Sequence, residues 1–337
     1  MEGSRTPVQP GPKRRGLTFF LTTLNLLLLA VFVCRSFGDE ARVWTFDFRD
    51  VFCDIAVLDD QNAVIVGARG RILTSHDQYK SLWCPRDSGT KNLLTCLSFV
   101  DTRSGWAAGH GGVIIHTRDG GRSWEVQRQS SPDNNPLFDI QFASPTVGYA
   151  CGAYGTLLKS TDGGNNWSSL STEADNNYNG LAFLDEDNGY LAGEFGTLLR
   201  TRDGGASWEK LDVGGFDGSF FGILLLTPQK ILLSGISGKI MRSDDSGRSW
   251  EDVSVPNCNQ SLFAGAVRGN EVVLAGRSGT LLISADGGRT FSPRNDKDLT
   301  SFAGVCARPK GGFLCVGERG NTLTVLAPVP PPEKDLP

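Results

Sequence analysis

Five aspartates recur at regular intervals along the chain and are the first candidates for chemistry. They are Asp119, Asp162, Asp203, Asp245 and Asp286. Paired carboxylates act as general acid and base in glycosidases, and clustered carboxylate oxygens bind calcium. Each of these aspartates, however, opens one copy of a repeated turn phrase, such as "DGGNNW" at residues 162–167. We therefore expect each on a different repeat unit, too far from the others to converge on one ion or one substrate.

The tyrosines do not fit the site of a sialidase, which needs a tyrosine nucleophile, a carboxylate partner and an arginine cluster. Tyr149 and Tyr190 occupy the same repeat position as Trp106, which indicates packing inside a repeat unit. We therefore predict that the protein is not an enzyme and has no catalytic residue.

The three histidines also lack a functional pattern, because none belongs to an H-x-x-x-H pair on a helix. They are His76, His110 and His116. His116 takes the repeat position of Lys159 and Arg200, which indicates a polar residue on a half-exposed strand. We expect no metal site, no cofactor and no small-molecule substrate.

The elements that must position these residues come from a tandem repeat. A G-x-x-G phrase followed by an apolar strand occurs seven times, at intervals of 41 to 43 residues. A fixed period of this length is typical of stacked units that cannot bury their own faces alone. Each unit contains four short strands with turns between them. The prediction is an all-β fold, a seven-bladed β-propeller of four-stranded antiparallel blades over residues 43–327. The first glycines of the phrases are Gly67, Gly109, Gly152, Gly193, Gly235, Gly276 and Gly317.

The aspartate phrase has a structural explanation in this fold. An Asp side chain accepts hydrogen bonds from the N–H groups of its turn, glycine supplies the positive φ, and the closing aromatic ring covers the turn. We assign this structural role to Asp119, Trp124, Asp162, Trp167, Asp203, Trp208, Asp245, Trp250, Asp286 and Phe291.

Ring closure is predicted from the ends of the repeat. The seventh unit lacks the aspartate phrase, while Trp44 lies 39 residues before Trp83, close to the repeat interval. We expect residues 43–48 to supply the outer strand of the last blade, whose three inner strands come from residues 301–327. Residues 328–337 read as a flexible proline-rich tail.

The N-terminus carries a membrane signal. Residues 1–15 form a basic tail, and residues 16–34 contain no charged side chain. The segment 16–35 is predicted to be a transmembrane helix that anchors the chain, with a cleaved signal as the alternative. Lys13, Arg14 and Arg15 favour a cytoplasmic N-terminus. The expected location is the inner membrane, single-pass, with the propeller in the periplasm or lumen.

Charge and cysteine content narrow the choice of partners. The chain has 33 basic and 37 acidic residues and a net charge of −4, which gives no reason to expect nucleic acid. Most of the eight cysteines lie in apolar strand-like runs and are expected to be buried thiols. Cys306 and Cys315 flank a short turn, so the sequence leaves open whether they form a disulfide bond.

The repeated phrase S/T-x-D-x-G-x-x-W resembles the Asp-box, or bacterial neuraminidase repeat. With "GTLLRTRDGGASW" at residues 196–208 and "NGYLAG" at residues 188–193, the chain resembles the photosystem II stability/assembly factor family of seven-bladed propellers. The resemblance implies a non-catalytic assembly or stability factor that docks on a membrane protein complex, such as the reaction centre, from the lumenal side. It also implies, for relatives in non-photosynthetic bacteria, an accessory subunit of an envelope transporter. A glycan-binding or sialidase-like propeller is the alternative from another class.

The predicted docking surface is built from the G-x-x-G turns and the long loops between blades. The residues between the glycines vary sharply, and aromatic residues beside arginines are typical of interface anchors. Ordinary solvated turns are the alternative, and Arg200, Arg202, Arg242 and Arg248 beside the Asp-boxes form a competing patch. The predicted partner-binding residues are Arg69, His110, Tyr154, Tyr178, Glu194, Phe195, Arg277, Glu318 and Arg319.

Overall fold

The computed structural model describes residues 44–47, 49–80, 83–129, 135–172, 175–295 and 299–325. The chain divides into two compact units, Met1–Val43 and Trp44–Pro337, and every described residue belongs to the second unit. The predicted basic tail, the segment 16–35 and the tail 328–337 lie outside the described residues. Within the described part of the chain, no helix is long and apolar enough to cross a bilayer.

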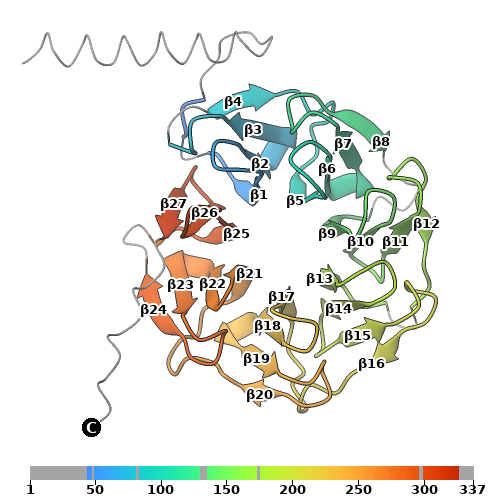
Figure 1. Cartoon of the computed structure of the whole chain (residues 1–337), viewed down its shortest axis with the longest axis vertical. Coiled ribbons are helices and arrows are strands. Elements are labelled where there is room, and N and C mark those ends of the chain that lie inside the picture. The colour runs from blue at the N-terminus through green and yellow to red at the C-terminus, as the bar shows by residue number, and fades with distance from the viewer. Residues whose placement is uncertain are drawn as a thin grey trace, which may run out of the picture. The chain divides into compact units, whose positions relative to one another are not determined.

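The described strands form antiparallel sheets that follow one another around a ring (Figure 1). The first three sheets consist of β1 (Phe52–Val57), β2 (Ala63–Gly67), β3 (Arg71–Ser75) and β4 (Trp83–Arg86); β5 (Leu94–Phe99), β6 (Gly105–Gly109), β7 (Ile114–Thr117) and β8 (Glu125–Arg128); and β9 (Leu137–Phe142), β10 (Gly148–Gly152), β11 (Leu157–Ser160) and β12 (Ser168–Ser169). We number the sheets as blades 1 to 7 in chain order.

The remaining sheets continue the ring. Blades 4 and 5 contain β13 (Tyr178–Phe183), β14 (Gly189–Gly193), β15 (Leu198–Thr201) and β16 (Glu209–Lys210), then β17 (Phe220–Leu225), β18 (Ile231–Gly235), β19 (Ile240–Ser243) and β20 (Glu251–Asp252). Blades 6 and 7 contain β21 (Leu262–Arg268), β22 (Glu271–Gly276), β23 (Thr280–Ser284) and β24 (Ser292–Asn295), then β25 (Phe302–Ala307), β26 (Phe313–Gly317) and β27 (Thr322–Val325). Short 3-10 turns occupy four of the G-x-x-G phrases: η1 (Ala68–Gly70), η2 (His110–Gly112), η3 (Ile236–Gly238) and η4 (Arg277–Gly279).

The fold-class prediction is corrected on three points. Six of the described sheets have four strands, but the last, β25–β27, has three, so seven four-stranded blades are not formed in the described part of the chain. Residues 44–47 are not a strand of blade 7, because the Trp44 N–H donates to the carbonyl of Trp83 in blade 1 at 2.7 Å. The predicted transmembrane helix is not among the described helices.

Blade 7 instead meets blade 1 through its inner strands. Val51 forms an isolated antiparallel bridge with Glu318, and the Gly320 N–H donates to the Asp50 carbonyl at 2.9 Å. Leu314 and Val316 of β26 belong to one buried cluster with residues of blade 1. Closure therefore depends on core packing and a few backbone bonds between the first and last blades.

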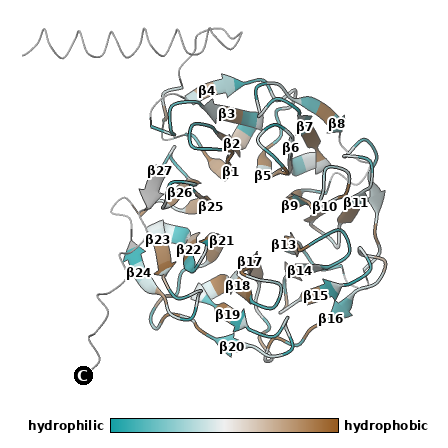
Figure 2. Ribbon diagram, viewed as in Figure 1, coloured by the Kyte–Doolittle hydropathy of each residue, from teal (hydrophilic) through white to brown (hydrophobic). Residues whose placement is uncertain are grey.

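The core lies between neighbouring blades, because the second strand of each blade is buried along its whole length or nearly so. Figure 2 shows that these strands are mostly apolar and that the short outer strands of blades 4 and 5 are polar. Trp106 illustrates the contact between blades: its ring stacks on Phe142 of blade 3, and its Nε1–H donates to the Gly163 carbonyl at 3.2 Å.

The first residue of each G-x-x-G phrase must be glycine because the backbone before the inner strand lies too close to it for a side chain. A Cβ on Gly109 would lie 2.0 Å from the Leu93 carbonyl oxygen, and the equivalent glycines meet the equivalent carbonyls at 2.0 to 2.4 Å. This position holds the β6–β7 turn against the start of β5. The other first glycines do the same in their own blades.

Cys306 and Cys315 are free thiols. Cys306 pairs with Leu314 and Cys315 pairs with Val305, so the two cysteines sit in adjacent registers and point to opposite faces of the sheet. A bond between them is therefore not formed.

Candidate functional site

The Asp-box aspartates organise their own turns. Asp286 accepts from the N–H groups of Arg289 and Thr290, both at 3.0 Å, and from the hydroxyls of Ser284 and Thr290 at 2.7 and 2.6 Å. Burial opposes ionisation, but the bonds from Thr290 and Ser284 outweigh it and lower the pKa of Asp286 to about 2. The aspartates stand on separate blades. No group of three metal-ligating side chains occurs in the described ranges.

We expect Asp286→Ala to lower the free energy of unfolding by about 1–2 kcal/mol, because four hydrogen bonds of the turn lose their acceptor. Urea denaturation at pH 7 measures the change. Asp217→Ala is the control, since Asp217 is exposed and changes at such positions stay within about 0.5 kcal/mol. Equal stability of the two variants would contradict a structural role for the Asp-box carboxylate.

The G-x-x-G turns gather on the face opposite the Asp-boxes, since successive hairpins of an antiparallel blade alternate between its two ends. The second residue of the phrase is His110, Glu194, Arg277 or Glu318 in four blades, and the third is Arg69, Tyr154, Phe195 or Arg319 in four. All of these residues are exposed except Glu194, which is half-buried and accepts from the Asn177 side chain at 3.1 Å. The turns therefore bring these eight predicted residues to one face.

Tyr154 and Phe195 are the two unusual side chains on this face. Tyr154 is 71% exposed and Phe195 is 69% exposed, and both residues have a φ of +54°. The left-handed region costs an ordinary residue about 1–2 kcal/mol, and bulky residues are rare there. Ser237 and Ser278 fill the same turn position in blades 5 and 6 with a φ of +55°. Exposed aromatic rings in a strained conformation indicate a role outside folding.

Tyr178 is different from the other predicted contacts. Its ring is fully buried at the start of β13, and its hydroxyl donates to the Thr172 hydroxyl at 2.6 Å. The equivalent first residues of other inner strands, such as Phe52 and Phe220, are also buried. Tyr178 therefore packs the blade and offers no ring to a partner in this structure.

A pocket of about 390 Å³ adjoins Phe195 on the same face. Leu211, Val213 and Phe216 supply apolar walls, and Lys210, Asp212 and Asp217 supply charge. Ile236, the exposed second residue of the next G-x-x-G turn, extends the apolar surface into blade 5. Sequence reasoning missed this pocket because it needs the loop between β16 and β17 beside the turn of blade 4.

The competing arginine patch divides into two kinds of residue. Arg200 and Arg242 are buried: Arg200 pairs with Glu209 at 2.6 Å and donates to the Ser246 carbonyl at 3.0 Å, while Arg242 pairs with Asp244. Arg202 and Arg248 are exposed. The buried pair connects neighbouring blades and is not available as a free surface.

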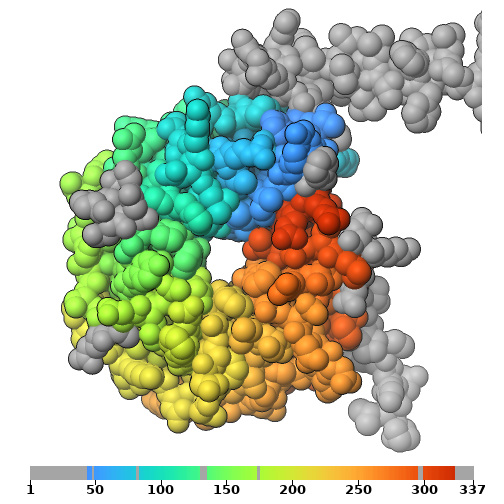
Figure 3. Space-filling model, turned by 180° about the vertical axis from the view of Figure 1, so that it is seen from behind, coloured from blue at the N-terminus to red at the C-terminus, as the bar shows by residue number. Residues whose placement is uncertain are grey.

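The central channel carries two carboxyl groups that the sequence reasoning did not single out. The space-filling view shows an opening at the centre of the ring (Figure 3), and a cavity of about 180 Å³ there is lined by residues of the inner strands. Asp54 accepts from the Leu97 N–H of blade 2 at 2.8 Å, and Asp139 accepts from the Leu181 N–H of blade 4 at 2.9 Å. Burial raises the pKa of both carboxyls to about 7 despite these bonds. These groups bridge blades, so their titration is expected to affect stability.

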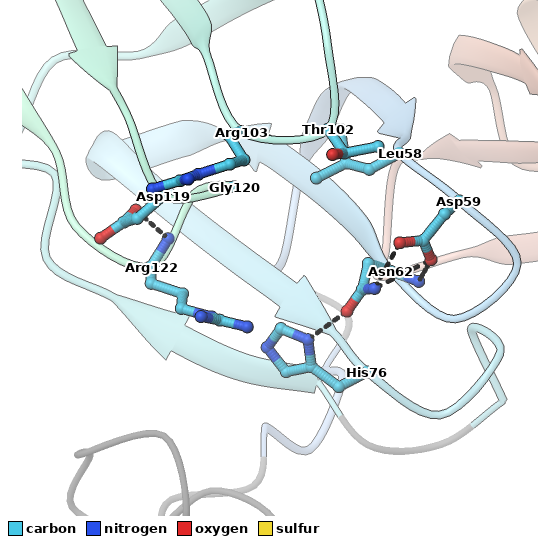
Figure 4. Close-up of a pocket in the computed structure, with 9 residues that line it drawn as sticks. All are labelled: Leu58, Asp59, Asn62, His76, Thr102, Arg103, Asp119, Gly120 and Arg122. Carbon is cyan, nitrogen blue, oxygen red and sulfur yellow. Dashed lines mark hydrogen bonds between the residues drawn. The ribbon is translucent and has the colours of Figure 1, made fainter.

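A third cavity, of about 280 Å³, opens between blades 1 and 2 on the Asp-box face (Figure 4). Leu58 and Thr102 form one wall, and His76, Arg103 and Arg122 line the rest together with Asp59, Asn62, Asp119 and Gly120. We refer to it as the blade 1–2 pocket.

The fold and the repeated turns define a β-propeller built from Asp-box repeats. The chain belongs to the family described as photosynthesis system II assembly factor YCF48, whose model matches residues 39–132 and 126–268. The family prediction made from the sequence is confirmed.

Solved structures share the fold at low sequence identity. The structure described as "YCF48 bound to D1 peptide" is 22% identical, with a TM-score of 0.69 over 85% of this chain and 97% of that one. YCF48 from Cyanidioschyzon merolae is 17% identical, with a TM-score of 0.67 over 85% and 99%. The WD40 β-propeller domain of Doa1 is 12% identical, with a TM-score of 0.68 over 86% and 96%. No curated protein matches the chain significantly.

Proposed function

We propose that this protein is a non-catalytic docking platform, an assembly, stability or accessory factor that binds a segment of a membrane protein complex on its G-x-x-G face. The observation that carries the proposal is the pair Tyr154 and Phe195, whose exposed rings occupy left-handed backbone positions that a serine fills in the next two blades. A folding role does not require either ring to face solvent.

The family supports a protein client. A structure of the same family is described as bound to a D1 peptide, and peptide recognition requires a surface, with no need for catalytic groups. The pocket beside Phe195 would take one apolar side chain of the client, while the flanking Lys210, Asp212 and Asp217 would contact its polar groups. We also propose that the propeller acts on the periplasmic or lumenal side of an inner membrane. The uncharged segment 16–34 and the basic residues before it support this location.

The test is affinity capture from detergent-solubilised membranes of the source organism with the tagged full-length chain, followed by mass spectrometry. Recovery of one membrane complex in stoichiometric amounts is the expected result. A reaction-centre subunit among the captured proteins would identify a photosystem client, and transporter subunits would identify an envelope transporter. Release of sugar from a fluorogenic sialoside, without any captured membrane protein, would contradict the proposal.

Tyr154→Gly with Phe195→Gly is expected to separate binding from folding. Glycine adopts the same φ without strain, so the free energy of unfolding should stay equal or rise by about 1 kcal/mol per site. Client capture should fall at least about tenfold, because aromatic anchors dominate interfaces. Ser237→Gly with Ser278→Gly changes the same turn position without removing a ring and should leave capture unchanged. Equal capture by both double variants would reject these anchors.

A further inference from the structure

The cavity beside Phe195, of about 390 Å³, is framed by two turns whose backbones are in contact. We refer to it as the Phe195 pocket. The loop between β16 and β17 meets the G-x-x-G turn of blade 4, where the Gly196 N–H donates to the Gly218 carbonyl at 2.7 Å. Gly196 leaves no room for a side chain, since a Cβ would lie 1.8 Å from the Phe216 carbonyl oxygen. The phenyl rings of Phe195 and Phe216 therefore project from turns that are fixed to each other.

The equivalent loops show that this pair of rings is particular to blade 4. In blades 1 and 5 a Cβ on the second glycine of the phrase would also meet a loop carbonyl, that of Thr90 at 2.0 Å and that of Cys258 at 1.9 Å. The third residue of the phrase is Arg69 in blade 1 and Ser237 in blade 5. Of these three blades, blade 4 alone has phenylalanine at both positions, although the backbone contact forms without it.

The base of the Phe195 pocket is apolar and well packed. Leu211 and Val213 are buried and belong, with the partly buried Phe216, to the core cluster that joins blades 4 and 5. The Phe195 side chain stands exposed at the mouth. Fixed apolar walls beneath an exposed ring suit one large apolar side chain of a partner, because burial of its surface stabilises the complex.

The mouth of the Phe195 pocket carries more negative than positive charge. Lys210, Asp212 and Asp217 line it and are exposed. Asp212 accepts from the Gly215 N–H at 3.2 Å, and among the described residues neither carboxylate forms an ion pair. Lys210 also lines a separate cavity of about 620 Å³ with Trp208, so it lies at the border of the Phe195 pocket. Two carboxylates without a cationic partner favour a positive charge beside the apolar residue that enters.

The neighbouring blade shows how a cation is held at a phenyl ring of this loop. The Lys239 Nζ lies 5.2 Å from the centre of the Phe216 ring and 2.7 Å from a carboxylate oxygen of Asp252. The ring quadrupole and the carboxylate both attract the ammonium group. The mouth of the Phe195 pocket offers a partner the same two contacts, an exposed phenyl ring and a carboxylate.

We propose that the Phe195 pocket receives a client segment in which a large apolar residue stands next to a lysine or an arginine. The apolar side chain lies against Leu211 and Val213, and the cationic group contacts Asp212 or Asp217. An acidic residue at the same place is disfavoured, because like charges across an interface repel one another. This inference rests on the proposed function, since it defines the chemistry of the client that docks on the G-x-x-G face.

Fluorine NMR of two tripeptide probes with the full-length chain tests this preference. Both probes have blocked termini and a central para-fluorophenylalanine, which is flanked by lysine in one probe and by glutamate in the other. We expect the lysine probe to bind at least about threefold more tightly at low salt. The difference should shrink at about 1 M salt, where exposed charges are screened. Unlabelled Lys-Ser-Lys should not displace the lysine probe, because it lacks the apolar side chain.

Three single variants locate the preference in the Phe195 pocket. Asp212→Asn and Asp217→Asn should each reduce the ratio of the two affinities. Asp87→Asn is the matched control, since Asp87 is exposed in the β4–β5 loop and also accepts from a glycine N–H of its own loop, that of Gly89 at 2.9 Å. It should leave the ratio unchanged. Phe195→Gly should weaken both probes at least about tenfold, because it removes an aromatic anchor.

The outcomes separate this inference from the proposed function. Equal affinity for the two probes, tighter binding of the glutamate probe, or an equal loss of preference in Asp87→Asn would overturn the inference. So would failure of both probes to bind while affinity capture recovers a membrane complex, and the proposed function would then stand. A lysine preference that depends on Asp212 and Asp217, without recovery of any membrane protein, would support the chemistry of the pocket and count against the proposed function.

Discussion

Replacement of Gly109 by alanine is expected to lower the free energy of unfolding by at least about 3 kcal/mol. The added Cβ would lie 2.0 Å from the Leu93 carbonyl oxygen and 2.8 Å from the Leu94 Cα, so two backbone segments must separate. Because neither segment ends in a flexible side chain, the clash disturbs the contact between the β6–β7 turn and β5. Urea denaturation followed by tryptophan fluorescence measures the loss.

Gly215→Ala is the matched control for this change. Gly215 has a φ of +72° but no atom within 4 Å of the added Cβ, so the change only places alanine in the left-handed backbone conformation that glycine adopts more readily. That preference costs about 1 kcal/mol. If Gly109→Ala were no more destabilising than Gly215→Ala, close backbone approach would not explain why the repeat begins with glycine.

The stability of the propeller is expected to fall as pH rises from about 4 to about 7. Asp54 and Asp139 have pKa values near 7 in the folded chain, against an ordinary value of 3.8, so the folded state binds their protons more tightly than the unfolded state. In that window the two carboxyl groups ionise in the unfolded chain but stay protonated in the folded chain, so the unfolded state is stabilised. Above pH 7 the loss of folding stability is complete. We expect two such groups to lower the free energy of unfolding by a few kcal/mol in total.

Urea denaturation between pH 4.5 and pH 8 measures this slope, and the Asp54→Asn, Asp139→Asn double variant should abolish it. The Asp-box carboxyls do not interfere, because those of Asp203, Asp245 and Asp286 have pKa values near 2 and titrate below the window. Wild-type stability that is flat or increases from pH 5 to pH 7 would show that the channel carboxyls are not buried as described.

The repeat could be predicted from the sequence because each blade is a local unit. The spacing of the G-x-x-G phrases gave the strands and turns of every blade, and the aspartate phrase indicated a turn whose hydrogen bonds are formed within five residues. Local hydrogen bonding of this kind leaves a pattern that residue types reveal. The number of strands in the last blade depends on contacts between distant parts of the chain, and there the prediction is wrong.

Trp44 shows why spacing alone misled the prediction of closure. Its separation from Trp83 in the sequence is close to the repeat interval. Its indole N–H nevertheless donates to Asp50 at 2.9 Å, and the Arg71 guanidinium lies over its ring. Trp44 therefore packs on blade 1. Comparison with the first residues of other inner strands would have identified Tyr178 as buried, since that repeat position is apolar in blades such as 1 and 5.

The residues that sequence reasoning missed act across blade boundaries. Asp54 and Asp139 share one repeat position, an acidic residue inside an otherwise apolar strand, and this was a readable signal. The N–H groups that they bind belong to the next blade, which the sequence does not reveal without the ring geometry.

Site-specific photocrosslinking tests the central proposal, that the G-x-x-G face receives a membrane-protein client, most directly. The crosslinking residue p-benzoylphenylalanine is placed at position 195 on that face, or at position 248 on the Asp-box face, of the full-length chain in its own membranes. We predict a crosslink to one membrane protein from position 195 and none from position 248. A crosslink from position 248 alone, or none from either position while affinity capture still recovers the client, would contradict the proposal.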